Sequence, residues 1–81
     1  MRAYIFITAK PGTSEDIVKA VESIKTVKGV TQADSIYGRF DVIVTLEADT
    51  LEEVSRIVYD VIEKIPNVIH TETALALFPR R

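Results

Sequence analysis

The chain has 81 residues, which is enough for one domain, residues 1–81, and leaves no room for a second. A chain of this size buries only about 60% of its unfolded surface, so its core is small. It has no cysteine, which excludes disulfide frameworks, zinc knuckles and thiol catalysis and fits a cytoplasmic location. A formal net charge of −2 provides no basic surface for direct nucleic-acid binding, and no apolar run is long enough for a membrane span. Few Asn, Gln and Met residues beside a charged fraction of 27% are weakly indicative of a thermophile.

The first half of the chain predicts a strand, a helix and a second strand. Residues 3–9 are an apolar, strand-like run that ends in a turn-forming Lys-Pro-Gly sequence. Thr13 has Asp16 three residues later, which is the capping-box pattern at the start of a helix. Apolar residues then recur at helical spacing as far as Ile24, so we expect a helix with one buried stripe. A strand is predicted over residues 30–37.

The second half repeats this order. A run rich in β-branched residues, 40–47, comes before Thr50, and Glu53 stands three residues after that threonine as in a capping box. Apolar residues at helical spacing continue to Ile62, and a last strand is predicted over residues 68–78. A duplicated βαβ unit predicts an α+β fold, the ferredoxin-like βαββαβ sandwich, with a four-stranded antiparallel sheet and two helices on one face.

Two predicted strands, which are central in this fold, are apolar on both faces. The first has Ala3, Ile5 and Ile7 on one side and Tyr4 and Phe6 on the other. The third has Val42, Val44 and Leu46 on one side, with Phe40 two positions before Val42, and Ile43 on the other. Because helices cover only one face, we expect the other to pack against a second subunit, which the hydrophobic content of 47% in so small a chain also favours. The alternative is that a long side chain or the C-terminal tail folds over this face.

Catalytic and nucleic-acid-binding patterns are not found. His70 is the single histidine, and no spacing of Ser, Asp or Glu forms a triad with it, so an ordinary strand position is the simpler interpretation. Tyr4 and Phe6 lack the flanking basic residues of an RNA-binding sheet, and Arg80-Arg81 is only a short basic end. The sequence therefore predicts no enzyme, no metal site, no cofactor and no direct nucleic-acid contact.

One segment is less easily explained by structure alone: residues 37–41, Tyr-Gly-Arg-Phe-Asp. Its glycine permits an unusual backbone between two strands, and Asp41 interrupts an apolar strand, where a carboxylate needs backbone amides or a cationic ligand group as donors. Thr71 and Thr73 add hydroxyls on one side of the last strand. The alternative is that Asp41 caps its own hairpin and the threonines are ordinary strand residues.

These segments resemble a known family. Residues 37–44 and 66–73, with a Gly-x-aromatic-Asp motif and a Val-x-x-Thr-x-Thr stretch, are similar to the effector-binding domain of Lrp/AsnC-type transcriptional regulators, also called the RAM domain. The resemblance covers essentially all 81 residues. Asn67 stands where the family commonly has glycine, and asparagine tolerates the same left-handed backbone.

The resemblance implies a homodimer whose sheets pack face to face, assembly of dimers into a ring, and a pocket for an amino acid or similar small effector between neighbouring dimers. By position, Gly38, Arg39, Phe40 and Asp41 would line this pocket, and Thr71 and Thr73 would approach it. Asp41 would either pair with the ammonium group of the amino acid or hold the loop in shape.

The full-length regulators also carry an N-terminal helix-turn-helix domain, whereas this chain starts with Met1 directly at its first strand. We therefore expect a stand-alone module that modulates transcription by mixing subunits with full-length Lrp/AsnC-type relatives. Three alternatives stay open: a pure assembly module without a ligand, an excised part of a longer regulator, and a small dimeric α+β barrel enzyme that uses His70.

Overall fold

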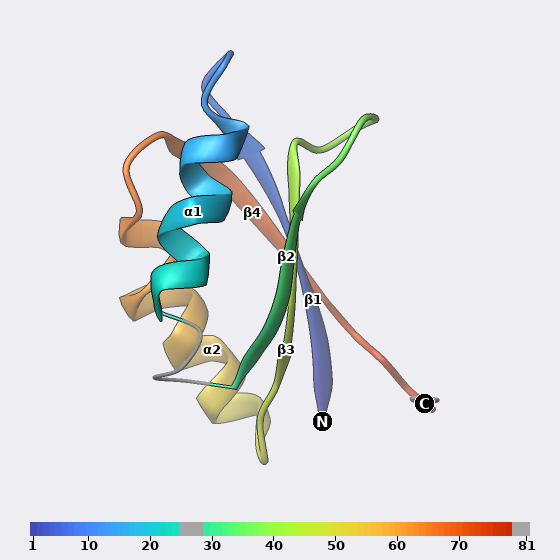
Figure 1. Ribbon diagram of the computed structural model, residues 1–81. Helices are drawn as coiled ribbons and strands as arrows, with labels where there is room; N and C mark the ends of the chain where they lie inside the picture. The colour runs from blue at the N-terminus through green and yellow to red at the C-terminus, as the bar shows by residue number, and fades with distance from the viewer. Residues whose placement is uncertain (25–28, 79–81) are drawn as a thin grey trace.

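Four antiparallel strands and two helices make up the computed structural model, which describes residues 1–24 and 29–78 (Figure 1). In chain order the elements are β1 (Arg2–Ala9), α1 (Ser14–Ile24), β2 (Val30–Ser35), β3 (Val42–Glu47), α2 (Leu51–Asp60), the 3-10 helix η1 (Ile62–Lys64) and β4 (Val68–Leu75). The strand order is β2-β3-β1-β4, and both helices cover the same face (Figure 1). The predicted α+β, ferredoxin-like fold is confirmed. The predicted basic end, Arg80-Arg81, lies outside the described residues.

Several predicted boundaries change because strand partners end. The strand predicted over residues 30–37 stops at Ser35, and the one predicted over residues 40–47 starts at Val42, so the connection between them is longer than predicted. The Ile36 amide still donates to the Asp41 carbonyl at 3.0 Å across this connection. The last strand ends at Leu75, before the predicted residue 78. Just after this end, the Ala76 amide donates to the carbonyl of Arg2 at 2.9 Å, and Arg2 is the first residue of the partner strand β1.

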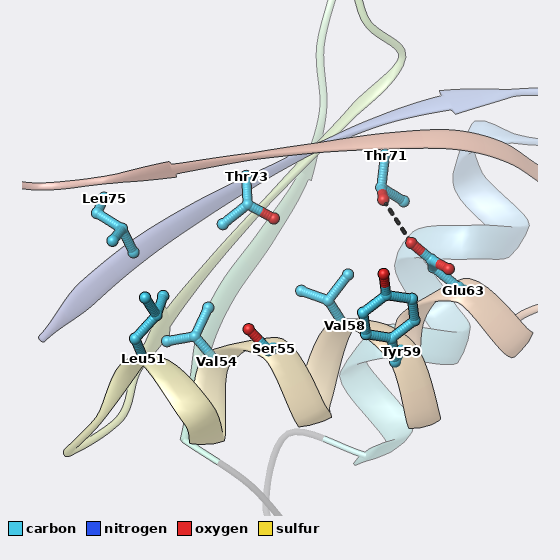
Figure 2. Close-up of a pocket in the computed structure, with 9 residues that line it drawn as sticks. All are labelled: Leu51, Val54, Ser55, Val58, Tyr59, Glu63, Thr71, Thr73 and Leu75. Atoms are coloured by element: carbon cyan, nitrogen blue, oxygen red, sulfur yellow. Dashed lines mark hydrogen bonds between the residues drawn. The ribbon is translucent and has the colours of Figure 1, made fainter.

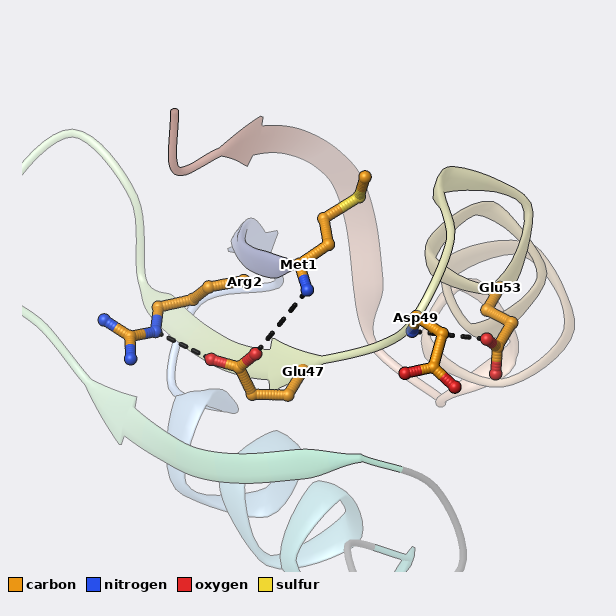
Figure 3. Close-up of polar contacts among 5 residues, drawn as sticks. All are labelled: Met1, Arg2, Glu47, Asp49 and Glu53. Carbon is orange, nitrogen blue, oxygen red and sulfur yellow. Dashed lines mark hydrogen bonds and ion pairs between the residues drawn. The ribbon is translucent and has the colours of Figure 1, made fainter. Parts of the chain in front are cut away.

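One of the two predicted capping boxes forms. The Thr50 hydroxyl accepts from the Glu53 amide at 3.1 Å. The Glu53 carboxylate accepts from the amide of Asp49, the residue before Thr50, at 3.2 Å (Figure 3). The Thr13 hydroxyl donates to the Lys10 carbonyl at 2.7 Å and so stabilises the turn before α1, which corrects the capping role predicted for it. Thr13 is thus a turn residue, whereas Thr50 satisfies an amide of the first turn of α2.

The core lies between the sheet and the helices. The residues with no exposed surface in the central strands are Ala3, Ile5, Ile7, Val42, Val44 and Leu46, and from the helical side Ile17, Val21 and Ile62 join them. Every second residue of β1 and β3 faces this core, as the alternation of side chains along a strand requires. The predicted alternation of the two central strands is therefore confirmed, and the structure shows which side of each strand faces the helices.

The opposite, open face of the sheet is also apolar at its centre. Tyr4, Phe6 and Ile43 are half-buried there, and the Phe40 ring lies against Phe6 with centroids 5.2 Å apart. Phe40, predicted on the same side of its strand as Val42, therefore lies on the opposite face, because the chain is no longer in a strand at this residue. Its ring covers part of the open face, as in the predicted alternative of a long side chain folding over it. The described part of the C-terminal tail, up to residue 78, does not cover it, since Leu77 and Phe78 are 84% and 82% exposed.

An ion pair joins the start of β1 to the end of β3. The Nε of Arg2 donates to the Glu47 carboxylate at 2.9 Å, and the amino group of Met1 lies 3.8 Å from the same carboxylate (Figure 3). The hydrogen bond to Glu47 raises the pKa of Arg2 above its ordinary value. In the part of the chain that the structure describes, no helix is long and apolar enough to cross a membrane.

Candidate functional site

The first half of the predicted site is the connection between β2 and β3. The hairpin end projects beyond the sheet (Figure 1), and Tyr37, Gly38 and Arg39 are exposed. A Cβ placed on Gly38 would meet no atom of the described residues within 4 Å, so a small molecule can approach this backbone. The guanidinium of Arg39 has no carboxylate partner in residues 1–24 and 29–78. The loop therefore presents one cation and open backbone.

Asp41 has a different environment from the exposed residues before it. Its carboxylate accepts a hydrogen bond from the Ala9 amide at 2.8 Å, and its own amide donates to the Ile7 carbonyl at 2.9 Å. The pairing of β1 shifts between Thr8 and Ala9, where the Ala9 amide takes Asp41 as its acceptor. Asp41 is half-buried. Of the two roles expected from the resemblance, this geometry favours the one in which Asp41 holds the loop in shape.

The second half of the predicted site lines a groove between β4 and α2. Thr71, Thr73 and Leu75 pair with Ile7, Ile5 and Ala3, so they share the helix-facing side of the sheet. The groove has a volume of about 340 Å³ (Figure 2). Its lining residues are Leu51, Val54, Ser55, Val58, Tyr59, Glu63, Thr71, Thr73 and Leu75.

The groove is polar at one end and apolar at the other. At the polar end the Thr71 hydroxyl donates to the Glu63 carboxylate at 3.0 Å, and the ring of Tyr59 lies next to them (Figure 2). At the other end Leu51 and Leu75 face each other across the groove (Figure 2). A site of this kind suits a small molecule with a polar group and an apolar part.

Sequence reasoning missed the helical side of this groove. Ser55 and Glu63 read as part of the polar face of the helix, although Leu51, Ser55 and Tyr59 follow one another at intervals of four residues. The large apolar residues Leu51 and Tyr59 at the ends of this row could have indicated the groove from the sequence. In the structure both side chains are exposed, at 53% and 67%.

Within one chain the groove residues Thr71 and Thr73 lie apart from the loop between β2 and β3. Thr71 pairs with Ile7 on the helix-facing side, whereas Phe40 packs on Phe6 on the open side. β4 is one edge strand and β2, which leads into the loop, is the other. The fold therefore brings Thr71 and Thr73 together, and keeps them apart from the exposed loop residues.

His70 and Glu72 alternate with the threonines and so belong to the open face. The His70 Nε2 lies 3.8 Å from the Glu72 carboxylate, and both side chains are exposed, at 63% and 60%. This arrangement is that of a solvated strand pair and places the imidazole away from the groove.

The chain is similar to several known proteins. The model of the Lrp/AsnC ligand binding domain family matches residues 2–78. The fold resembles the hypothetical protein PHS023 from Pyrococcus horikoshii (27% identity, TM-score 0.78, covering 96% of this chain and 90% of that one). It also resembles FFRP-DM1 (28% identity, TM-score 0.77, covering 94% and 97%). Among curated proteins none matches significantly.

A third solved structure extends the likeness of fold to a longer protein. It is the feast or famine regulatory protein from M. tuberculosis complexed with L-methionine, at 19% identity and a TM-score of 0.78. The match covers 96% of this chain and 50% of that one, so our chain spans half of that regulator. Since the family model spans residues 2–78 of a chain of 81, the protein belongs to the family of Lrp/AsnC ligand-binding domains.

Proposed function

We propose that this protein is a regulatory module that binds a free amino acid at sites completed by two copies of the chain. One copy contributes the groove with Thr71 and Thr73, and the other contributes the loop Gly38, Arg39, Phe40 and Asp41. The observation that carries this proposal is that the groove and the loop lie apart in one chain: Thr71 is on the helix-facing side of the edge strand β4, whereas the loop follows the other edge strand, β2, and its Phe40 packs on the open face. Membership of a ligand-binding family and the L-methionine complex of a protein with this fold support it.

The chemistry of the two halves is complementary. The loop carries the Arg39 guanidinium, which has no carboxylate partner among the described residues, and open backbone at Gly38, and both suit a carboxylate. The groove supplies hydroxyl groups and an apolar wall, which suit the rest of an amino acid. Each half alone leaves a bound amino acid open to solvent, so closure by a second copy raises the buried surface of the ligand.

Assembly into a homodimer, and of dimers into a ring, is part of the proposal. The half-buried apolar centre of the open face, Tyr4, Phe6 and Ile43, suits packing against the same face of a second copy. Dimers of this kind leave the grooves on the outer, helical side, where a neighbouring dimer can contribute its loop. The same surfaces would allow mixed assemblies with full-length Lrp/AsnC-type regulators, and through them an effect on transcription.

A subunit-mixing experiment tests the shared site. The double variant Thr71→Val/Thr73→Val removes the hydroxyls of the groove, and Arg39→Gln removes the cation of the loop. Each variant alone should lose amino-acid binding in native mass spectrometry with a pool of common amino acids. After the two are unfolded and refolded together in equal amounts, about one site in four combines an intact groove with an intact loop, so binding should return to that level.

The outcomes separate the parts of the proposal. Wild-type assemblies that take up no amino acid would contradict ligand binding and leave a pure assembly module. Wild-type binding without recovery in the mixture would place the whole site within one chain. A wild-type protein that stays monomeric would contradict the assembly itself.

A further inference from the structure

We propose that Glu63 is the residue that binds the ammonium group of the ligand, and that the groove selects an amino acid with an uncharged, apolar side chain. This inference rests on the proposed amino-acid function and deepens it, because it gives the ligand an orientation in the groove and a chemical class.

Glu63 is held in position to bind a cation. It belongs to the short helix η1 just after α2, and its side chain points into the groove toward β4 (Figure 2). One carboxylate oxygen accepts the hydrogen bond from Thr71 at 3.0 Å. The other oxygen has no partner within the described residues. A carboxylate fixed by one donor and open on its second oxygen is a ready acceptor for an ammonium N–H.

The charge of the groove points the same way. Among the described residues that line it, Glu63 is the only one that carries a charge at neutral pH. A ligand carboxylate at this end would be repelled, whereas an ammonium would form a charge-assisted hydrogen bond. The carboxylate of the amino acid must then face away from Glu63, toward the loop of the neighbouring copy with its Arg39.

Asp41, the acid that the family resemblance brings forward for this role, is already engaged. Its Oδ2 accepts from the Ala9 amide at 2.8 Å, and the residue is half-buried at the end of β1. As in Glu63, the second carboxylate oxygen has no partner within the described residues, but Asp41 is less exposed than Glu63 and does not line the groove. Glu63 is exposed and lies in the groove itself, so it can bind the ligand without a rearrangement of the fold.

The other end of the groove sets the side-chain class. The residues there are apolar: Leu51, Val54 and Leu75 (Figure 2). A charged side chain placed against them would lose hydration without gaining a counter-charge, whereas an aliphatic one gains by burial. The volume of about 340 Å³ lies at the small end of the range for ligand pockets, which fits one amino acid.

Isothermal titration of the wild-type protein with four ligands tests both parts. The ligands are L-leucine, L-lysine, L-aspartate and 4-methylpentanoate, which is leucine without its amino group. We expect L-leucine to bind best, and 4-methylpentanoate to bind at least about tenfold more weakly because it lacks the charge-assisted bond. Glu63→Gln keeps the size and the acceptor for Thr71, and should weaken L-leucine by at least about tenfold.

The matched control is Glu22→Gln, which removes the same charge from an exposed position of α1 and should leave the affinity unchanged. Circular dichroism on heating checks that each variant is folded. L-leucine binding that is equal in wild-type and Glu63→Gln protein, or equal binding of 4-methylpentanoate, would overturn the role of Glu63 while the proposed function stands. Equal binding of L-lysine or L-aspartate would overturn the side-chain class. If the wild-type protein binds no amino acid, both proposals fail.

Discussion

β1 and β4 lie side by side and each has eight residues, yet they do different things on the same face of the sheet. Ile5 and Ile7 in β1 have no exposed surface, whereas their partners in β4, Thr73 and Thr71, line an open groove. β1 is a central strand beneath the helices, and β4 is an edge strand that α2 leaves partly uncovered. The comparison shows how one sheet places fully buried core residues and the wall of an open groove on neighbouring strands.

The largest expected effect is on stability in β1. Ile5→Ala creates a cavity in the centre of the core and should lower the free energy of unfolding by about 2–5 kcal/mol. Thr73→Ala, at the partner position in β4, should change it by no more than about 0.5 kcal/mol because the residue is exposed. Urea denaturation followed by circular dichroism measures both. Equal costs would contradict the division of roles between the strands.

Asp41→Ala should have the next largest effect, since it leaves the Ala9 amide without its acceptor. We expect a loss of about 1–3 kcal/mol in the free energy of unfolding and faster hydrogen exchange at the Ala9 amide. Asp34→Ala is the control, an exposed acid in β2 whose carboxylate accepts from the Gln32 side chain. If Asp41→Ala weakens only ligand binding and leaves the exchange of Ala9 unchanged, then Asp41 contacts the ligand.

The helix that forms the other wall of the groove depends on its cap. Thr50→Ala removes the acceptor for the Glu53 amide and should cost about 1 kcal/mol of stability. Thr13→Ala should cost less, because its hydroxyl donates to the Lys10 carbonyl in a turn. Thermal unfolding of the two variants measures the difference. An equal or larger loss of stability for Thr13→Ala would contradict this difference between the two helix starts.

The smallest effect on stability is expected in the groove. Thr71→Val keeps the β-branched shape and should change the free energy of unfolding by no more than about 0.5 kcal/mol, while it releases the Glu63 carboxylate. The affinity for L-leucine should then fall several-fold, because the carboxylate must be ordered when the ligand binds. Titration and denaturation of the same sample give both quantities. A stability loss without a change in affinity would make Thr71 a purely structural residue.

Local patterns in the chain are enough to obtain the fold. The alternation in β1 and β3, the helical spacing after Thr50 and the repeated βαβ order depend on neighbouring residues only, so periodicity identifies them. The same patterns marked Thr71 and Thr73 as hydroxyls on one side of a strand. They failed at Thr13, where a turn carbonyl competes for the hydroxyl, and at the strand ends, where the length of the partner sets the limit.

Three-dimensional packing determines the contacts between different elements, which the periodicity of the sequence does not predict. The register of β1 against β4 places Thr71 beside Ile7, where its hydroxyl donates to the Glu63 carboxylate. At the register shift of β1, the Ala9 amide donates to the Asp41 carboxylate. These contacts join residues from different elements, and their partners depend on how α2 and β4 are positioned relative to each other. For this reason the exposed loop could be singled out from the chain alone, whereas the acid that faces the groove could not.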